Sequence, residues 1–315
     1  MTRALAEAHS ERAGAPHAAG APLARRRRRI DLLPYALVAP FALFVVLLAI
    51  VPAAWTIGLS FFHDAALDPP VRFAGFQNFI TAFSSSSILQ SSGNTVVYMV
   101  VGVVLSTIIG TAAALLLQTS FRGRSVVIAV LILPWALPGI VAGLIWVNVF
   151  DANTGLLNSV LTSLHVITDY RVWVGDNRLL TVFLIELVQV WQMVPLSALL
   201  ILAALQNVPD ELYEAARLDG CSGWALIRRI SVPLARPGIA IAAVQSVVAT
   251  LNIFDQPYAL NGQADAGASL TMQTYFVSFQ NLDFGQGYAL ALVIAVATVI
   301  VSFGVLKLVY RQVEY

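Results

Sequence analysis

The sequence predicts an all-α, polytopic membrane protein with six transmembrane helices and an ordered helical loop on the cytoplasmic side between the fourth and the fifth. Hydrophobic residues make up 58% of the 315 residues and charged residues only 11%, whereas a soluble chain carries about 25% charge. Six stretches are apolar and long enough to cross about 30 Å of hydrocarbon. Basic residues gather in alternate connections, as positive residues do on the cytoplasmic side.

The predicted spans lie at about 32–62, 95–117, 126–150, 179–205, 239–254 and 288–310. The first is too long for the apolar region of a cleavable signal peptide. Pro134 and Pro138 are expected to kink the third span. Asn252, Asp255 and Pro257 leave the outer end of the fifth span ragged.

The charged residues predict the domain organisation and the orientation. Residues 1–29 lack apolar periodicity and are expected to form a disordered basic tail before a transmembrane domain of residues 30–315. All but three of the 18 basic residues fall in this tail, in the loops 118–125 and 206–238, or at the C-terminal end. Both termini are therefore expected in the cytoplasm, and the loops near 63–94, 151–178 and 255–287 outside it. The run Arg25–Arg29 is expected to fix the topology and touch anionic lipid rather than bind nucleic acid.

Several kinds of chemistry are not expected of this chain. The one lysine, Lys307, follows no glycine-rich loop, so a P-loop that hydrolyses ATP is excluded. The single cysteine, Cys221, forms no internal disulfide or cysteine-rich zinc site. The four histidines are scattered, without a pair at metal-ligand spacing. We therefore expect neither a metal nor a cofactor bound by this chain.

The cytoplasmic segment 207–238 is too patterned for a linker. Pro209 suits a first helical turn, and Gly220 suits the left-handed residue that ends a helix. Between them, Leu212, Ala215 and Ala216 are expected to form an apolar stripe. A second helix is expected from Ser222 to Arg229, with a break forced by Pro233.

Three interpretations of this loop remain open. The unit folds back onto the chain's own helix ends, or it is a DNA-binding helix-turn-helix, or it docks a separate cytoplasmic protein. A helix of about ten residues is marginal alone in water, so some partner must pack on it. For docking, Ala215 and Ala216 would allow close approach, while Glu214 and Arg217 would supply charged contacts.

The run Glu214-Ala215-Ala216-Arg217-Leu218-Asp219-Gly220, with Ile230, Pro233, Pro237 and Gly238 after it, closely resembles the EAA loop of ABC importer permeases. Within these it is similar to the MalF/UgpA/SugA-type subunit of carbohydrate importers, over roughly residues 31–311. Supporting matches are Leu133-Pro134-Trp135, Gly155-Leu156-Leu157-Asn158 and Asp283-Phe284-Gly285. The sequence departs from the pattern at Cys221, where alanine is usual, and at Asn261–Ala264 in an outer loop.

This resemblance implies a non-catalytic permease subunit in the cytoplasmic membrane of a prokaryote. Its implied partners are a second homologous permease, two copies of a cytoplasmic ATPase that uses ATP and Mg, and an extracytoplasmic solute-binding protein that delivers a sugar, a di- or oligosaccharide. The ATPase would dock on the coupling helix of the EAA loop, and the residues expected at that contact are Glu214, Ala215, Ala216, Arg217, Asp219, Gly220 and Pro233.

Polar residues inside the spans suggest a substrate path. Glu186 lies about 10 Å deep at 1.5 Å per residue, so its side chain should face the bundle or a wet cavity. A functional and a structural role for it remain equally open. Aromatic rings stack on sugar faces, and amides or carboxylates bond hydroxyls, although each such residue also serves as a helix–helix contact. The candidates are Glu186, Gln189, Trp191, Gln192, Asn252, Asp255 and Tyr258.

Other functions remain as alternatives to sugar import. The same machinery could carry glycerol 3-phosphate, but no confidently placed span interior holds the Arg or Lys that a phosphate favours. A proton-coupled secondary transporter would use Glu186, yet it would not require the ordered loop. A membrane-embedded enzyme would need a nucleophile–base pair or a metal site at membrane depth, and neither is found.

Overall fold

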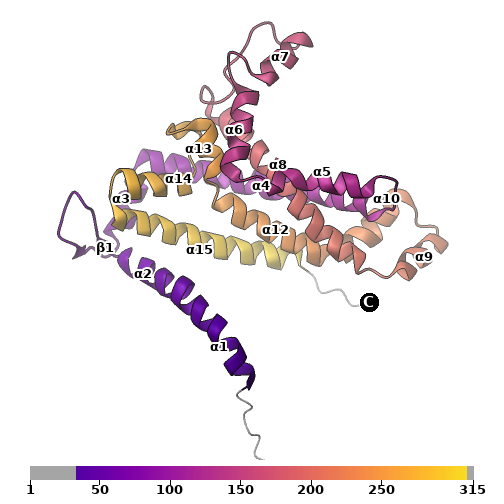
Figure 1. Cartoon of the computed structure of the whole chain (residues 1–315), viewed down its shortest axis with the longest axis horizontal. Coiled ribbons are helices and arrows are strands. Elements are labelled where there is room, and N and C mark those ends of the chain that lie inside the picture. The colour runs from indigo at the N-terminus through magenta and orange to yellow at the C-terminus, as the bar shows by residue number, and fades with distance from the viewer. Residues whose placement is uncertain (1–32, 311–315) are drawn as a thin grey trace, which may run out of the picture. The chain divides into compact units, whose positions relative to one another are not determined.

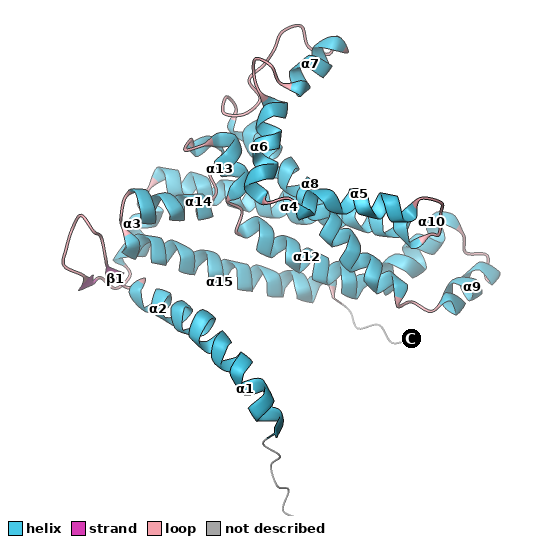
Figure 2. Ribbon diagram, viewed as in Figure 1, coloured by secondary structure: helices cyan, strands magenta, loops and turns pink. Residues whose placement is uncertain are grey.

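The computed structural model describes residues 33–310, so the predicted tail of residues 1–29 lies outside the described residues. Helices dominate the described part, with a single two-stranded antiparallel sheet (Figures 1 and 2). The all-α, membrane-spanning fold class is thereby confirmed. Contacts divide the chain into two units, one up to Val51 and one from Pro52 onwards.

The first unit contains α1 (Leu33–Val45) and the π-helical turn η2 (Val46–Ile50), and the helix continues as α2 (Val51–Leu59). The 23 residues Leu37–Leu59 are apolar and long enough to cross a membrane. They correspond to the predicted first span.

Three further helices of the second unit are long enough to span: α4 (Ser86–Gln118), α8 (Arg178–Gln206) and α15 (Phe284–Val309). α4 begins nine residues before the predicted start of the second span at residue 95. The extra turns are rich in serine and escape a hydropathy pattern. They are ordered by tertiary contacts, since Ile88 is buried and Asn94 Nδ2 donates 2.9 Å to the carbonyl of Ala268.

Two bent pairs of helices occur, one in the position of the predicted third span and one that leads into the predicted fifth span. α5 (Arg124–Ala136) and α6 (Gly139–Phe150) meet at 97°, which confirms the predicted kink and places it at Leu137–Pro138. A second break of 69° separates the residues Gly223–Leu234 from α12 (Arg236–Leu251). The described residues therefore contain four candidate spans, or six if each bent pair crosses once.

The second break lies after Pro233 and not before it, so the predicted end of that helix is wrong. The helix runs through α10 (Gly223–Leu226), the π-helical turn η3 (Ile227–Ser231) and α11 (Val232–Leu234). The amide of Val232 bonds the carbonyl of Ile227, five residues back. This wide turn leads into Pro233 at the start of α11, where a missing N–H is tolerated.

The predicted outer loops contain short elements that the sequence pattern did not reveal. In β1 (Phe62–His63) and β2 (Arg72–Phe73), Phe62 pairs with Phe73. The segment 255–287 is largely helical. The helical elements in these regions are α3 (Gln77–Ser84), α7 (Leu156–Ser163), α13 (Asp255–Asn261), η4 (Asp265–Gly267), α14 (Leu270–Tyr275) and η5 (Phe276–Gln280).

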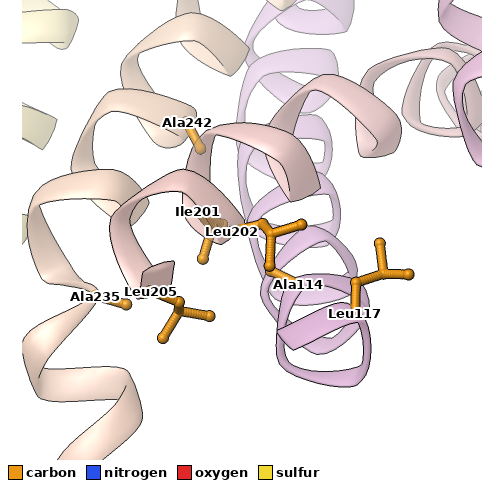
Figure 3. Close-up of a cluster of buried hydrophobic side chains, with 7 residues drawn as sticks. All are labelled: Ala114, Leu117, Ile201, Leu202, Leu205, Ala235 and Ala242. Carbon is orange, nitrogen blue, oxygen red and sulfur yellow. The ribbon is translucent and has the colours of Figure 1, made fainter. Parts of the chain in front are cut away.

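The core of the second unit lies where α8 packs against α4 and α12. At the end of these helices near α9 (Asp210–Leu218), a buried cluster joins the three (Figure 3), made of Ala114, Leu117, Ile201, Leu202, Leu205, Ala235 and Ala242. Glycines allow this close approach, because a Cβ at Gly238 would come within 2.5 Å of the Ala204 Cβ. Ser106 and Ser246 share a buried hydrogen bond of 2.8 Å between α4 and α12.

Candidate functional site

Helix α9 (Asp210–Leu218) is the first part of the ordered loop, and it lies at the same end of the second unit as α10 (Figure 1). It begins after Pro209. Two backbone hydrogen bonds cap its C-terminal end, from Gly220 N to the Arg217 carbonyl (3.0 Å) and from Cys221 N to the Ala216 carbonyl (2.8 Å). Gly220 has φ of +79°, which confirms its predicted left-handed conformation.

The buried face of α9 differs from the predicted stripe. Tyr213 and Ala216 are its buried residues, whereas Leu212 and Ala215 are exposed. The Tyr213 hydroxyl accepts a 2.9 Å hydrogen bond from Gln118 Nε2, at the end of α4. The missed signal was the spacing of Tyr213 and Ala216, three residues apart and hence on one face.

The exposed surface of α9 mixes charged with apolar side chains. Glu214 and Arg217, together with Tyr213, line a polar hollow of about 540 Å³ between α9, the end of α4 and the second helix of the loop. Leu218 is 88% exposed and Trp224 is 73% exposed. Among the expected docking residues, Ala216 is buried and Pro233 half-buried; those exposed are Glu214, Ala215, Arg217, Asp219 and Gly220.

The expected substrate-path residues do not form one cluster. Gln189 and Gln192 share a small polar cavity of about 170 Å³. Trp191 lies instead in an apolar pocket, with its ring 5.7 Å from that of Trp146. Asn252 is exposed and donates to a carbonyl of its own helix, that of Val248.

Two further candidates, Asp255 and Tyr258, lie on α13. Tyr258 stacks on Phe254 at a centroid distance of 5.3 Å. The Asp255 carboxylate occupies the space that a Cβ on Gly139 would take, and Ala259 approaches Gly143 in the same way. α13 therefore packs closely on the half-span α6 through two glycines one turn apart.

Polar residues that the sequence interpretation missed complete the small cavity: Gln245 and Ser246 from α12, Gln256 from α13 and Ser197 from α8. Their amides and hydroxyls could hold a polar solute or ordered water. Gln245 and Ser246 lie in the middle of the predicted fifth span, where amides and hydroxyls are uncommon, and that was the available signal.

The Gln192 amide is committed to protein groups. Its Nε2 donates to the carbonyls of Pro134 (3.3 Å) and Leu137 (3.1 Å), at the broken end of α5. Its Oε1 accepts a short hydrogen bond from Gln256 Nε2. Freed carbonyls at membrane depth need donors, so Gln192 stabilises the break in the third span and links it to α13.

Glu186 is 1% exposed and sits where α8 meets α4 and α12. A Cβ on Gly102 would overlap its carboxylate, and the Thr250 methyl borders the same space. Among residues 33–310, neither carboxylate oxygen has a hydrogen-bond partner, and neither does Gln189 Oε1 one turn away. Glu186 and Gln189 are thus the expected path residues with buried acceptors that have no partner among the described residues.

The chain is similar in sequence to known transport proteins. A family model described as "Binding-protein-dependent transport system inner membrane component" matches residues 102–313. The chain is 31% identical to the trehalose/maltose transport system permease protein MalF of Thermococcus litoralis, over 88% of this chain and 92% of that protein. It is also 31% identical to the sulfoquinovosyl glycerol transport system permease protein SmoG of Agrobacterium fabrum, over 88% and 90%.

A solved structure shares the fold. It is a bacterial alginate ABC transporter in complex with an alginate pentasaccharide-bound periplasmic protein, and one of its chains matches with a TM-score of 0.73 at 20% identity. The match covers 87% of this chain and 93% of that one.

Proposed function

The chain belongs to the binding-protein-dependent transport system inner membrane component family, and on that premise we propose that it is the permease subunit of an ATP-driven sugar importer. The observation that carries the proposal is the ordered loop 207–238. It holds a capped helix, α9, against the end of α4 and leaves charged and apolar side chains of that helix exposed.

The partner on the exposed face of α9 is a cytoplasmic ATPase. Tyr213 fixes the helix to α4, so a force applied to Glu214, Arg217 or Leu218 is transmitted to a spanning helix. This chain has no P-loop, and the ATP and Mg belong to two copies of that partner. The chain itself is non-catalytic and binds no cofactor.

The solute is a neutral sugar, a di- or oligosaccharide. One relative is named for trehalose and maltose, which are neutral disaccharides, and the other for sulfoquinovosyl glycerol, which carries a sulfonate, so the names support a sugar and not its neutrality. The cavity beside the broken third span is lined by glutamines and serines, which suit hydroxyl groups. No Arg or Lys lines it, so glycerol 3-phosphate fits less well.

The remaining partners are a second homologous permease and an extracytoplasmic solute-binding protein. The alginate transporter of similar fold was solved with its periplasmic protein bound. The α13–η5 segment and α7 lie on the side that the positive-inside rule assigns to the exterior, where such a protein would deliver the sugar. Candidate path residues on this route are Glu186, Gln189, Asn252, Asp255 and Tyr258.

The decisive experiment compares Gly220→Asp with Gly175→Asp. Both glycines have positive φ and open space at the Cβ position, but Gly175 lies in an outer loop. Gly220→Asp should abolish ATP-dependent sugar uptake and ATPase co-purification while the protein still inserts. Gly175→Asp imposes the same kind of backbone strain and should leave ATPase association intact. Normal uptake and association in Gly220→Asp would refute the docking function.

Uptake into proteoliposomes separates the alternative classes. Transport driven by ATP in the complete complex, and absent with a proton gradient alone, supports the importer. Uptake by the purified chain with a proton gradient, lost in Glu186→Gln, would instead identify a secondary transporter.

A further inference from the structure

Helix α7 carries an apolar stripe that faces away from its own packing contacts. Leu156, Val160 and Leu164 recur every four residues and are 61%, 44% and 66% exposed. Asn158 lies on the inward side of the helix and is fully buried. The stripe continues at Val166, which is also largely exposed.

The stripe is held rigidly, because the loop that joins α6 to α8 folds around Asn158. Its Nδ2 donates to the carbonyls of Asp151 (3.2 Å), Ala152 (3.3 Å) and Arg171 (3.0 Å). Its Oδ1 accepts from the Arg171 amide (3.1 Å) and from Trp173 Nε1 (2.8 Å). A single side chain thereby ties both ends of the connection to α7 and fixes the direction in which the stripe points.

Helix α7 directly follows a predicted half-span in the chain and therefore begins close to the membrane. It follows the apolar half-span α6 after a short turn, and α6 leads away from the long helices towards α7 (Figure 1). Trp146 and Phe150 lie at the end of α6, and Trp173 packs into the same cluster. Tryptophans of this kind gather at membrane–water interfaces.

The charge pattern favours lipid over a protein partner. No Asp, Glu, Lys or Arg occurs in residues 152–168. A protein-docking face on an exposed loop normally has a charged or polar rim. An uncharged apolar stripe that continues the apolar surface of a span suits the boundary between headgroups and acyl chains.

We propose that α7 lies flat in the outer leaflet, with Leu156, Val160 and Leu164 inserted among the lipids at the interface. The Ser159 side of the helix then faces the loop, where the Ser159 and Tyr170 hydroxyls are hydrogen-bonded at 3.1 Å. Because the surface is uncharged, its insertion does not depend on anionic lipid. The helix anchors the free end of the bent α5–α6 pair in the membrane plane.

The test uses the full chain with its partner subunits in nanodiscs of phosphatidylcholine. Cys221 is replaced by alanine, and a fluorophore is placed on Val160→Cys, Leu164→Cys or the control Asn153→Cys. Asn153 is exposed, polar and three residues before the stripe begins. Doxyl-labelled phosphatidylcholine should quench the probes at 160 and 164 about threefold more than the probe at 153, as insertion of about 5–10 Å implies. Adding anionic phosphatidylglycerol should leave this ratio unchanged.

Two results would overturn the proposal. One is equal quenching at all three sites by aqueous iodide with none by the doxyl lipid. The other is shielding of 160 and 164 that appears only when a binding protein or second permease is added, which would assign the stripe to protein. Trypsin cleavage at Arg171 at the parent rate verifies that each variant keeps its loop folded.

Discussion

Helices α7 and α9 are similar in length, at eight and nine residues, yet they have opposite surfaces. α7 has no charged residue and exposes an aliphatic stripe, whereas α9 carries Asp210, Glu211, Glu214 and Arg217. Each is fixed by one buried polar side chain, Asn158 in the first case and Tyr213 in the second. The two helices use the same construction for different partners.

The difference teaches that charge, rather than helix length or amphipathicity, distinguishes a membrane-facing helix from a protein-facing one in this chain. Both helices are too short to be stable alone. Once the anchoring residue of each helix is buried, the side chains that remain exposed determine which partner the helix contacts.

Among the substitutions that test this comparison, Tyr213→Ala is expected to have the largest effect on ATPase binding. Removing a buried aromatic ring costs about 3–5 kcal/mol, so α9 should detach from α4 and ATPase co-purification should be lost. Tyr213→Phe is the matched control and loses only the hydrogen bond from Gln118, about 1 kcal/mol. Equal ATPase association in both variants would show that the anchor does not hold the docking surface.

Asn158→Ala should loosen α7 in the same way. It leaves partly buried partners such as Trp173 Nε1 without an acceptor, at no more than about 1–3 kcal/mol for each such group. The expected result is faster external trypsin cleavage at Arg171, with ATPase association unchanged. Asn153→Ala is the control, because its side chain makes no hydrogen bond within the described residues. Unchanged cleavage in Asn158→Ala would contradict the role of Asn158 as the anchor.

Two matched substitutions introduce an aspartate into the exposed apolar surface of each helix. Leu218→Asp should weaken ATPase co-purification by removing an apolar contact, since full burial of a leucine contributes about 1.5–3 kcal/mol. Val160→Asp should leave that association unchanged and instead reduce fluorescence quenching by doxyl lipid at position 164. Loss of ATPase binding in Val160→Asp would abolish the proposed distinction.

The smallest effect is a pH dependence at the start of the α7 connection. The backbone amide of Thr154, then that of Asn153 and the Thr154 hydroxyl, hold the pKa of the Asp151 carboxyl below its usual range. A lowered folded-state pKa gives stability that is present above the unfolded pKa and lost as the pH falls through the folded value. A mobility probe at Asn153 should therefore stay ordered until below the normal range of aspartate, and Asp151→Asn should remove the transition. A transition at the same pH in Asp151→Asn would assign it to another group.

Hydropathy, proline positions and helix-end residues predicted much of the fold. The long helices, the kink before Pro138 and the left-handed Gly220 follow from local chemistry. The helices of the 255–287 segment did not, because they depend on distant contacts, such as the donation from Tyr98 Oη to the Gly267 carbonyl (2.7 Å). The end of the loop's second helix was misplaced because a π-helical turn accommodates Pro233.

In the candidate site, too, features that depend on local sequence were predicted and features that depend on distant contacts were not. Glu214, Arg217 and Gly220, which the resemblance assigns to the docking contact, are exposed, whereas the anchoring Tyr213 was missed. Within the spans, residue type alone could not distinguish Gln192, which holds main-chain carbonyls, from Gln189, whose acceptor is free. That distinction depends on which neighbour lies within reach, and no spacing along the sequence encodes it.

The void left by the missing side chain of Gly102 is filled by the carboxylate of Glu186 on another helix. The two positions therefore share one volume and are constrained to change together. A homologue with alanine at the first is expected to carry a shorter side chain at the second, and the engineer who wishes to replace Glu186 with a small residue has an empty space to fill at Gly102.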